Sequence, residues 1–235
     1  MKTPAPIYRL KRAARALSHK LEIPLHEALD RIAQQEGYGR WSLLSSAVAR
    51  PASKLFAALQ PGDMVLLGAR PGHGKTLMSL ELAVEAMKAG HQASFFTLEY
   101  TQRDVLDRFR AIGAEPARFE RLFRFDDSDL ISADYIQSRL FDAPHGSLVV
   151  VDYLQLLDQR RDNPALDIQV RTLERFARQR GLILIFISQI DRSYDSSAKP
   201  LPDMRDIRLP NPVDLSLFSK TCFLNNGEIV FQTLR

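Results

Sequence analysis

The stretch that decides the fold is "LLGARPGHGKTLMSL", residues 66–80, in which a glycine-rich loop separates an apolar run from an amphipathic one. Residues 69–76 match the phosphate-binding pattern Gly-x-x-x-x-Gly-Lys-Ser/Thr, with alanine at the first glycine position. That position needs only a small residue where a strand turns into a loop. Gly72 and Gly74 allow backbone N–H groups to converge on phosphate oxygens, and the following helix adds the positive end of its dipole. The pattern therefore predicts a nucleoside triphosphate site.

Two residues of the loop have distinct predicted roles. Lys75 is expected to neutralise the β- and γ-phosphates, and Thr76 to hold Mg²⁺ through its hydroxyl. No Asn/Thr-Lys-x-Asp motif for reading guanine is present, so ATP is favoured over GTP, with Mg²⁺ as the metal. No His/Cys cluster has metal-ligand spacing. The predicted nucleotide-binding residues are Ala69, Arg70, Pro71, Gly72, His73, Gly74, Lys75, Thr76 and Leu77.

A second group for the metal is predicted in "SLVVVDYLQLL", residues 147–157. Its apolar run indicates a buried strand that delivers Asp152 to its carboxyl end, where an aspartate can order the Mg²⁺ shell. An aspartate after a strand is by itself usually a turn residue. Its pairing with the glycine-rich loop favours the metal role.

Hydrolysis also needs a group that accepts a proton from water. Tyr153 stands where many ATPases carry a glutamate, immediately after the metal aspartate. Glu99, in "FFTLEY", ends the strand after the loop helix, and Gln189 follows the apolar run "LILIFIS". Because parallel strands end side by side, Glu99 is a candidate base and Gln189 a candidate γ-phosphate sensor. A surface carboxylate and an ordinary polar strand terminator are the alternatives. The predicted catalytic set is Glu99, Lys75, Asp152 and Gln189.

From residue 55 onward, short apolar runs alternate with helical patterns, which predicts an α/β domain with a mainly parallel central sheet flanked by helices. Asn226-Gly227, between two β-rich runs, predicts a C-terminal β-hairpin. Strands are predicted at 63–69, 92–98, 122–125, 147–153 and 182–188, and helices at 76–89, 101–112, 132–141 and 165–180.

The N-terminal part has a different pattern. Helices are predicted at 5–18, at 25–36 and within 39–48, followed by a linker at 49–54. We therefore expect a small helical module at 1–50 and the ATPase domain at 51–235. Residues 1–54 contain ten Lys or Arg and four Asp or Glu, a balance of +6, whereas the remainder has a balance of −2. This excess indicates either attraction for nucleic acid or a solvated basic face.

The composition and the lengths of the apolar runs argue against membrane-spanning, secreted and disulfide-bonded proteins. The chain has 235 residues, of which 45% are hydrophobic and 26% charged, as in ordinary globular proteins. Its longest apolar runs are strand-sized, well below the roughly 18 residues of a membrane-spanning helix. The basic N-terminus lacks the apolar core of a secretory signal. A single cysteine, Cys222, excludes an internal disulfide and is expected to be a core residue. A cytoplasmic protein without membrane association is expected.

Five segments occur in the order found in DnaB-type replicative helicases: "LQPGDMVLLGARPGHGKT", "FFTLEY", "LVVVDYLQLL", "ISQIDRS" and "RDIR". Residues 55–218 resemble the RecA-like P-loop ATPase domain of that helicase family, which belongs to superfamily 4. The resemblance implies ATP hydrolysis, with Glu99 as the catalytic glutamate, Asp152 as the Walker-B aspartate and Gln189 as the sensor. It also implies that residues 158–167 and 191–208 line a channel for single-stranded DNA. The candidate phosphate contacts there are Arg160, Arg161, Arg192 and Lys199, although a solvated loop would also contain such residues.

The chain also departs from the family's pattern. Residues 1–50 do not resemble the family's N-terminal domain and linker helix, so a different module with its own protein partner is expected. Ring assembly as a homo-oligomer is left open. Phe223 and Asn225 occupy the positions of a basic pair that reaches the neighbouring subunit's nucleotide, with Lys220 and Arg235 as candidate substitutes.

Two hypotheses therefore remain. The first is a helicase-like ATPase that acts on DNA. The second is a nucleotide-switched adaptor or loader with weak ATPase activity and no unwinding, because an arginine finger contributes roughly 10³–10⁵ to turnover.

Overall fold

The computed structural model describes residues 7–47, 51–195, 199, 201–209, 211–225 and 228–234. The chain forms two compact units, Met1–Lys54 and Leu55–Arg235, each with its own hydrophobic core. The linker predicted at 49–54 is wrong over residues 51–54, because helix α4 (Pro51–Ala57) begins at Pro51. Proline is favoured in the first turn of a helix, where its missing N–H has no partner to lose.

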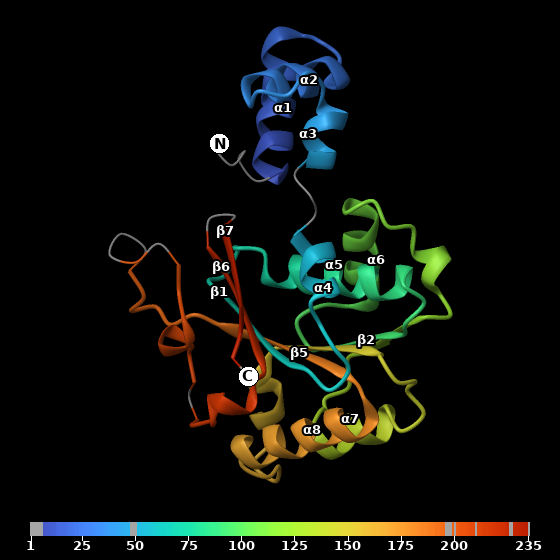
Figure 1. Cartoon of the computed structure of the whole chain (residues 1–235), viewed down its shortest axis with the longest axis vertical. Coiled ribbons are helices and arrows are strands. Elements are labelled where there is room, and N and C mark those ends of the chain that lie inside the picture. Colours follow the sequence, from blue (N-terminus) through green and yellow to red (C-terminus); the bar gives the residue numbers. More distant parts are fainter. Residues whose placement is uncertain are drawn as a thin grey trace. The chain divides into compact units, whose positions relative to one another are not determined.

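Before α4, the described residues of the first unit form the helices α1 (Ile7–Leu21), α2 (Leu25–Gln35) and α3 (Trp41–Ala47), which confirms the helical pattern of this region (Figure 1). Small and aliphatic side chains of all three helices form its core. Gly37, with a φ of 85°, follows the end of α2 in the left-handed conformation that glycine favours. The buried core residues of this unit are Leu10, Ala14, Ala28, Ile32, Ala33 and Leu44.

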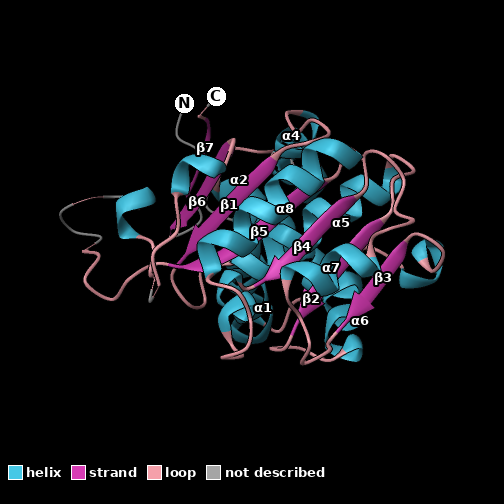
Figure 2. Ribbon diagram, turned by 90° about the horizontal axis from the view of Figure 1, so that it is seen from below, coloured by secondary structure: helices cyan, strands magenta, loops and turns pink. Residues whose placement is uncertain are grey.

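The second unit is built on a seven-stranded sheet with the order β3-β2-β4-β5-β1-β6-β7 (Figure 2). All neighbouring strands are parallel except β6 and β7, which are antiparallel. This arrangement confirms the mainly parallel sheet. The strands are β1 (Met64–Ala69), β2 (Ala93–Thr97), β3 (Phe123–Asp126), β4 (Leu148–Asp152), β5 (Ile183–Gln189), β6 (Lys220–Asn225) and β7 (Glu228–Thr233).

Helices cover both faces of this sheet: α5 (Lys75–Lys88) and α6 (Gln102–Ala111) lie on one face, and α7 (Ala133–Arg139) and α8 (Leu166–Arg180) on the other (Figure 1). Because both faces are covered, every residue of β1 and of β4 is buried, as its continuous apolar run predicts. None of the described helices is long and apolar enough to cross a lipid bilayer. The 3-10 helices are η1 (Pro116–Phe119), η2 (Leu154–Asp158), η3 (Met204–Asp206) and η4 (Leu215–Leu217).

The strand register determines which loops meet. Ala69, at the end of β1, is paired with Gln189, at the end of β5. Asp152, at the end of β4, is paired with Thr97 of β2. We call this edge of the sheet, where β1, β2, β4 and β5 end, the carboxyl rim; ligands of open α/β sheets bind at such a rim.

The C-terminal strands extend the sheet beyond β1. Lys220, the first residue of β6, is paired with Val65 near the start of β1, whereas Leu224 is paired with Ala69 at its end. Lys220 therefore lies at the edge opposite the carboxyl rim. The predicted turn residues Asn226 and Gly227 lie outside the described residues, while the antiparallel pairing of β6 with β7 confirms the hairpin.

Candidate nucleotide site

The glycine-rich loop connects β1 directly to α5, whose first residue is Lys75. Gly72 and Gly74 have φ values of 79° and 91°, in the left-handed region that side chains rarely adopt. A Cβ added at either position would meet no atom within 4 Å, so the backbone conformation rather than crowding requires glycine. The first turn of α5 contains no acidic residue, so the positive end of its dipole remains available to an anion.

Lys75 and Thr76 are largely buried, each with 8% of its surface exposed. The Thr76 hydroxyl donates a hydrogen bond to Oδ2 of Asp152 at 3.2 Å, so the loop and the end of β4 are in direct contact. Among the described residues, no hydrogen bond or ion pair holds the Lys75 ammonium. A buried cation of this kind is costly unless an anion approaches it, which suits a phosphate ligand.

Asp152 is fully buried, and its second carboxylate oxygen, Oδ1, has no hydrogen-bond partner among the described residues. Burial raises the pKa of Asp152 to about 6; the charge of Lys75 opposes this rise, and that of Glu99 adds to it. A buried carboxylate with one unpaired oxygen is suited to binding a cation. Mg²⁺ prefers oxygen ligands of the kind that Thr76 and Asp152 offer. The described residues contain no cluster of three or more His, Cys, Asp or Glu for a metal. An ion here would take its remaining ligands from phosphate and water.

The two other predicted catalytic residues lie on the same rim. Glu99 comes two residues after Thr97, and its backbone N–H donates to the Thr97 hydroxyl at 3.0 Å. Because Thr97 is paired with Asp152, this turn places Glu99 beside the end of β4, close enough for its charge to raise the pKa of Asp152. Gln189 ends β5, directly opposite the first loop residue, Ala69. The structure thus brings all four predicted catalytic residues to one rim.

Arg108 is a residue of this rim that the sequence patterns did not identify. Its guanidinium carbon lies 4.2 Å from the ring centroid of Tyr100, the residue after Glu99, and its charge lowers the pKa of Asp152. Helix α6 begins at this point with a capping box in which Thr101 and Asp104 exchange hydrogen bonds. The cap directs α6 so that Arg108, two turns later, reaches back over Tyr100. The contact of Arg108 with Tyr100 depends on the turn between β2 and α6, and no spacing of residues in the sequence predicts it.

The predicted DNA contacts have different surroundings. Arg160 and Arg161 are exposed in the turn after η2. Arg192 is also exposed, and its backbone carbonyl accepts a hydrogen bond from Nη2 of Arg70 at 3.2 Å. Lys199, by contrast, is paired with Asp203 at 2.7 Å and with Asp206 at 2.6 Å. Its charge is therefore balanced within its own segment.

The positions of the basic pair are occupied by buried residues. Phe223 is 1% exposed, and its ring packs so closely over β1 that a Cβ on Gly68 would lie 2.7 Å from it. Asn225 is also buried. Lys220 is buried at the edge opposite the carboxyl rim and pairs with Asp63 at 2.9 Å, so its charge is already balanced within this chain. The other candidate, Arg235, lies outside the described residues.

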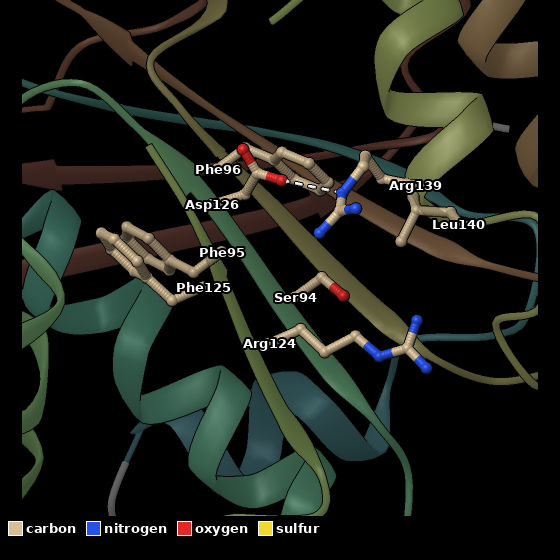
Figure 3. A pocket seen from close by; sticks show the side chains of 8 residues that line it. All are labelled: Ser94, Phe95, Phe96, Arg124, Phe125, Asp126, Arg139 and Leu140. Carbon is tan, nitrogen blue, oxygen red and sulfur yellow. Dashed lines mark hydrogen bonds and ion pairs between the residues drawn. The ribbon is translucent and has the colours of Figure 1, made fainter. Parts of the chain in front are cut away.

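A small cavity of about 20 Å³ lies between the edge strand β3, its neighbour β2 and the end of α7 (Figure 3). Its volume is about that of one water molecule. Arg139 pairs with Asp126 at 3.0 Å there, and Arg124 with Asp142 at 2.9 Å. Because its charges are already paired, this cavity offers no competing nucleotide site.

The loop geometry, the contact of Thr76 with Asp152 and the position of β5 between β1 and β4 define a P-loop nucleotide-binding domain. Residues 52–115 match the family described as DnaB-like helicase C terminal domain. The replicative DNA helicase DnaB of Synechocystis sp. is 28% identical in an alignment of 181 positions that covers 64% of this chain and 21% of that relative.

Two solved structures show the same fold. One, described as an ATPase domain, superposes with a TM-score of 0.57 at 20% identity, covering 77% of this chain and 79% of that one. The KaiC-like protein PH0186 from Pyrococcus horikoshii has a TM-score of 0.55 at 16% identity, covering 74% and 80%. The second unit of this chain has the RecA-like fold of these structures, and residues 52–115 resemble the ATPase domain of DnaB-type helicases. The chain spans 21% to 44% of the length of the curated helicases it matches.

Proposed function

We propose that this protein binds ATP with Mg²⁺ at the carboxyl rim and hydrolyses it while acting on DNA. The observation that carries this proposal is the contact of Thr76 with the buried Asp152, whose Oδ1 is unpaired among the described residues, beside an open phosphate-binding loop. The four residues to which we assign catalytic roles, Lys75, Glu99, Asp152 and Gln189, lie close to this rim, which supports the proposal.

The proposed roles follow from position. The loop from Ala69 to Leu77 cradles the phosphates, and Lys75 balances the charge of the β- and γ-phosphates. Thr76 and Asp152 would hold Mg²⁺, which supplies charge neutralisation for the phosphate oxygens when bound. Glu99 accepts the proton of the attacking water, and Gln189 contacts the γ-phosphate.

Action on DNA is proposed from the relatives, which are named replicative DNA helicases, and from the exposed arginines in the segments that follow η2 and β5. Arg160, Arg161 and Arg192 are the proposed contacts with the phosphates of single-stranded DNA. Arg70 connects the two functions: it bonds to the Arg192 carbonyl, and its guanidinium lies 5.7 Å from the Tyr194 ring centroid. A change in the nucleotide loop would thereby reach the DNA-binding segment.

The test is steady-state ATP hydrolysis with and without single-stranded DNA. We expect stimulation, and we expect the double variant Arg160→Gln/Arg161→Gln to need about tenfold more DNA for half-maximal stimulation, since two charged contacts are lost. Arg118→Gln/Arg121→Gln, which removes two exposed arginines elsewhere on the same unit, is the matched control. A rate that does not change on adding DNA would contradict the proposal.

A second candidate is the nucleotide-switched adaptor or loader, with weak ATPase activity and no unwinding. It is favoured by the buried Phe223 and Asn225 at the positions of the basic pair, and by the distant placement of Lys220. It requires ATP binding without appreciable turnover at saturating ATP and DNA. Sedimentation with ATP would show whether the protein self-associates, as the helicase candidate requires.

Arg108→Ala is expected to lower kcat about tenfold while leaving the Kd for ATP nearly unchanged. Arg108 stacks on Tyr100 and so positions the adjacent Glu99, and small displacements of catalytic groups are costly. Rapid-quench kinetics and nucleotide binding would separate the two quantities. Arg110→Ala is the control, because Arg110 lies on the same helix but pairs with the exposed Asp107 at 2.6 Å. An equal loss in both variants would show a general effect on α6.

A further inference from the structure

Helix α1 of the first unit carries its charge on one face. Leu10 and Ala14 are buried in the core of this unit, and Leu17 packs against it, so the orientation of the helix is determined by its apolar side. The opposite side is exposed and basic, with no acidic residue anywhere in the helix. The exposed cations of this face are Lys11, Arg12, Arg15 and Lys20. We call these four residues the α1 basic face.

The α1 basic face is not neutralised within the described part of the first unit. None of its four side chains has an ion pair among the described residues. Two of the unit's acidic residues are engaged elsewhere: Glu27 pairs with Arg31 at 2.7 Å, and Asp30 accepts a hydrogen bond from the backbone N–H of Trp41 at 2.7 Å. A concentrated positive charge of this kind attracts a polyanion.

The residues between the cations favour close approach to that polyanion. Ala16 is exposed and lies four residues from both Arg12 and Lys20, so its small side chain leaves room for a phosphate backbone near the helix axis. From residue 11 to residue 20 an α-helix rises about 14 Å, at about 1.5 Å per residue. Duplex DNA presents one negative charge per roughly 1.7 Å of its axis, so several phosphates lie within reach of four cations over this length.

The composition of the face favours a duplex over a single strand. Proteins that bind single strands stack successive bases on several aromatic side chains, whereas the sequence of α1 contains a single aromatic residue, Tyr8. Trp41 and Tyr38, the aromatic residues of the described loop and α3, pack against the core. We propose that the α1 basic face binds the sugar–phosphate backbone of duplex DNA, as a site separate from the ATPase rim. This inference does not depend on the proposed function of the second unit.

The test is binding of the full-length protein to a duplex of about 20 base pairs, measured by fluorescence anisotropy over a range of salt concentrations. We expect the variant Lys11→Gln/Arg12→Gln/Arg15→Gln/Lys20→Gln to lose at least about tenfold in affinity, with a slope of log K against log salt that is smaller by about three to four. The double variants Lys11→Gln/Arg12→Gln and Arg15→Gln/Lys20→Gln should each reduce the slope by about half as much as the fourfold variant does. They keep the test valid if the fourfold variant does not fold.

The matched control removes four exposed arginines from the second unit: Arg110, Arg118, Arg121 and Arg175. It should bind the duplex as the unaltered protein does. An equal loss in the control, or unchanged duplex binding in the α1 variant, would overturn the proposal. So would a loss confined to a single strand of the same length, or to vesicles rich in phosphatidylserine, which would assign the face to another partner. Retained DNA-stimulated ATP hydrolysis in the α1 variant would show that the two sites are distinct.

Discussion

Glu99→Gln is expected to lower the rate of ATP hydrolysis at least about a hundredfold while leaving ATP binding nearly unchanged, since a general base contributes roughly 10²–10⁴ to rate. The amide cannot accept the proton of water, yet it has nearly the same shape as the carboxylate. The Thr97 hydroxyl accepts a hydrogen bond from the backbone of Glu99, not from its side chain, so the turn should survive the change.

Single-turnover hydrolysis and equilibrium nucleotide binding measure these two effects separately. Glu120→Gln, at an exposed position outside the rim, is the matched control and should hydrolyse ATP at the normal rate. A parallel loss of binding and hydrolysis would indicate a folding defect and would remove the support for Glu99 as the base. Full activity of the variant would assign the proton transfer to another group.

Lys75→Ala is expected to weaken ATP binding by about a hundredfold and to abolish turnover. Removing one partner of a desolvated charge pair costs roughly 2–5 kcal/mol, and Lys75 is only 8% exposed, with no ion-pair partner among the described residues. The protein itself should lose little stability, because no hydrogen bond or ion pair among the described residues holds the Lys75 ammonium.

Isothermal titration calorimetry with ATP and a thermal melt would check both statements. Lys88→Ala is a close control, since Lys88 ends the same helix and pairs with Glu85 at 2.7 Å on the surface. ATP affinity equal to that of the unaltered protein would refute the assignment of the phosphate-binding loop. A large fall in melting temperature would instead give Lys75 a structural role.

The loop and the strands were predictable because their signals are local. A strand buried on both faces needs a continuous apolar run, and a left-handed turn needs glycine, so both appear in a few consecutive residues. The same reasoning located Asp152, Glu99 and Gln189 at strand ends. Their meeting on one rim followed from the parallel sheet, and the register of β1, β2, β4 and β5 confirms it.

Other features depend on contacts between distant segments and could not be predicted. The sequence allowed Lys220 to replace the family's basic pair, but the parallel pairing of β6 with β1 places it at the opposite edge, beside Asp63. Lys199 is of a residue type that often contacts phosphate, yet its charge is balanced by ion pairs with Asp203 and Asp206. Whether a cation is available to a ligand is decided by its neighbours in space.

By itself, the sequence determined the class of the fold, the phosphate-binding loop and the basic character of the first unit, because propensity, periodicity and charge are properties of short segments. The tertiary structure decided which carboxylate contacts Thr76, how the Arg108 guanidinium comes to lie over the Tyr100 ring, and which side of α1 is exposed. These features arise from strand order and helix packing, which bring together residues that no linear pattern connects.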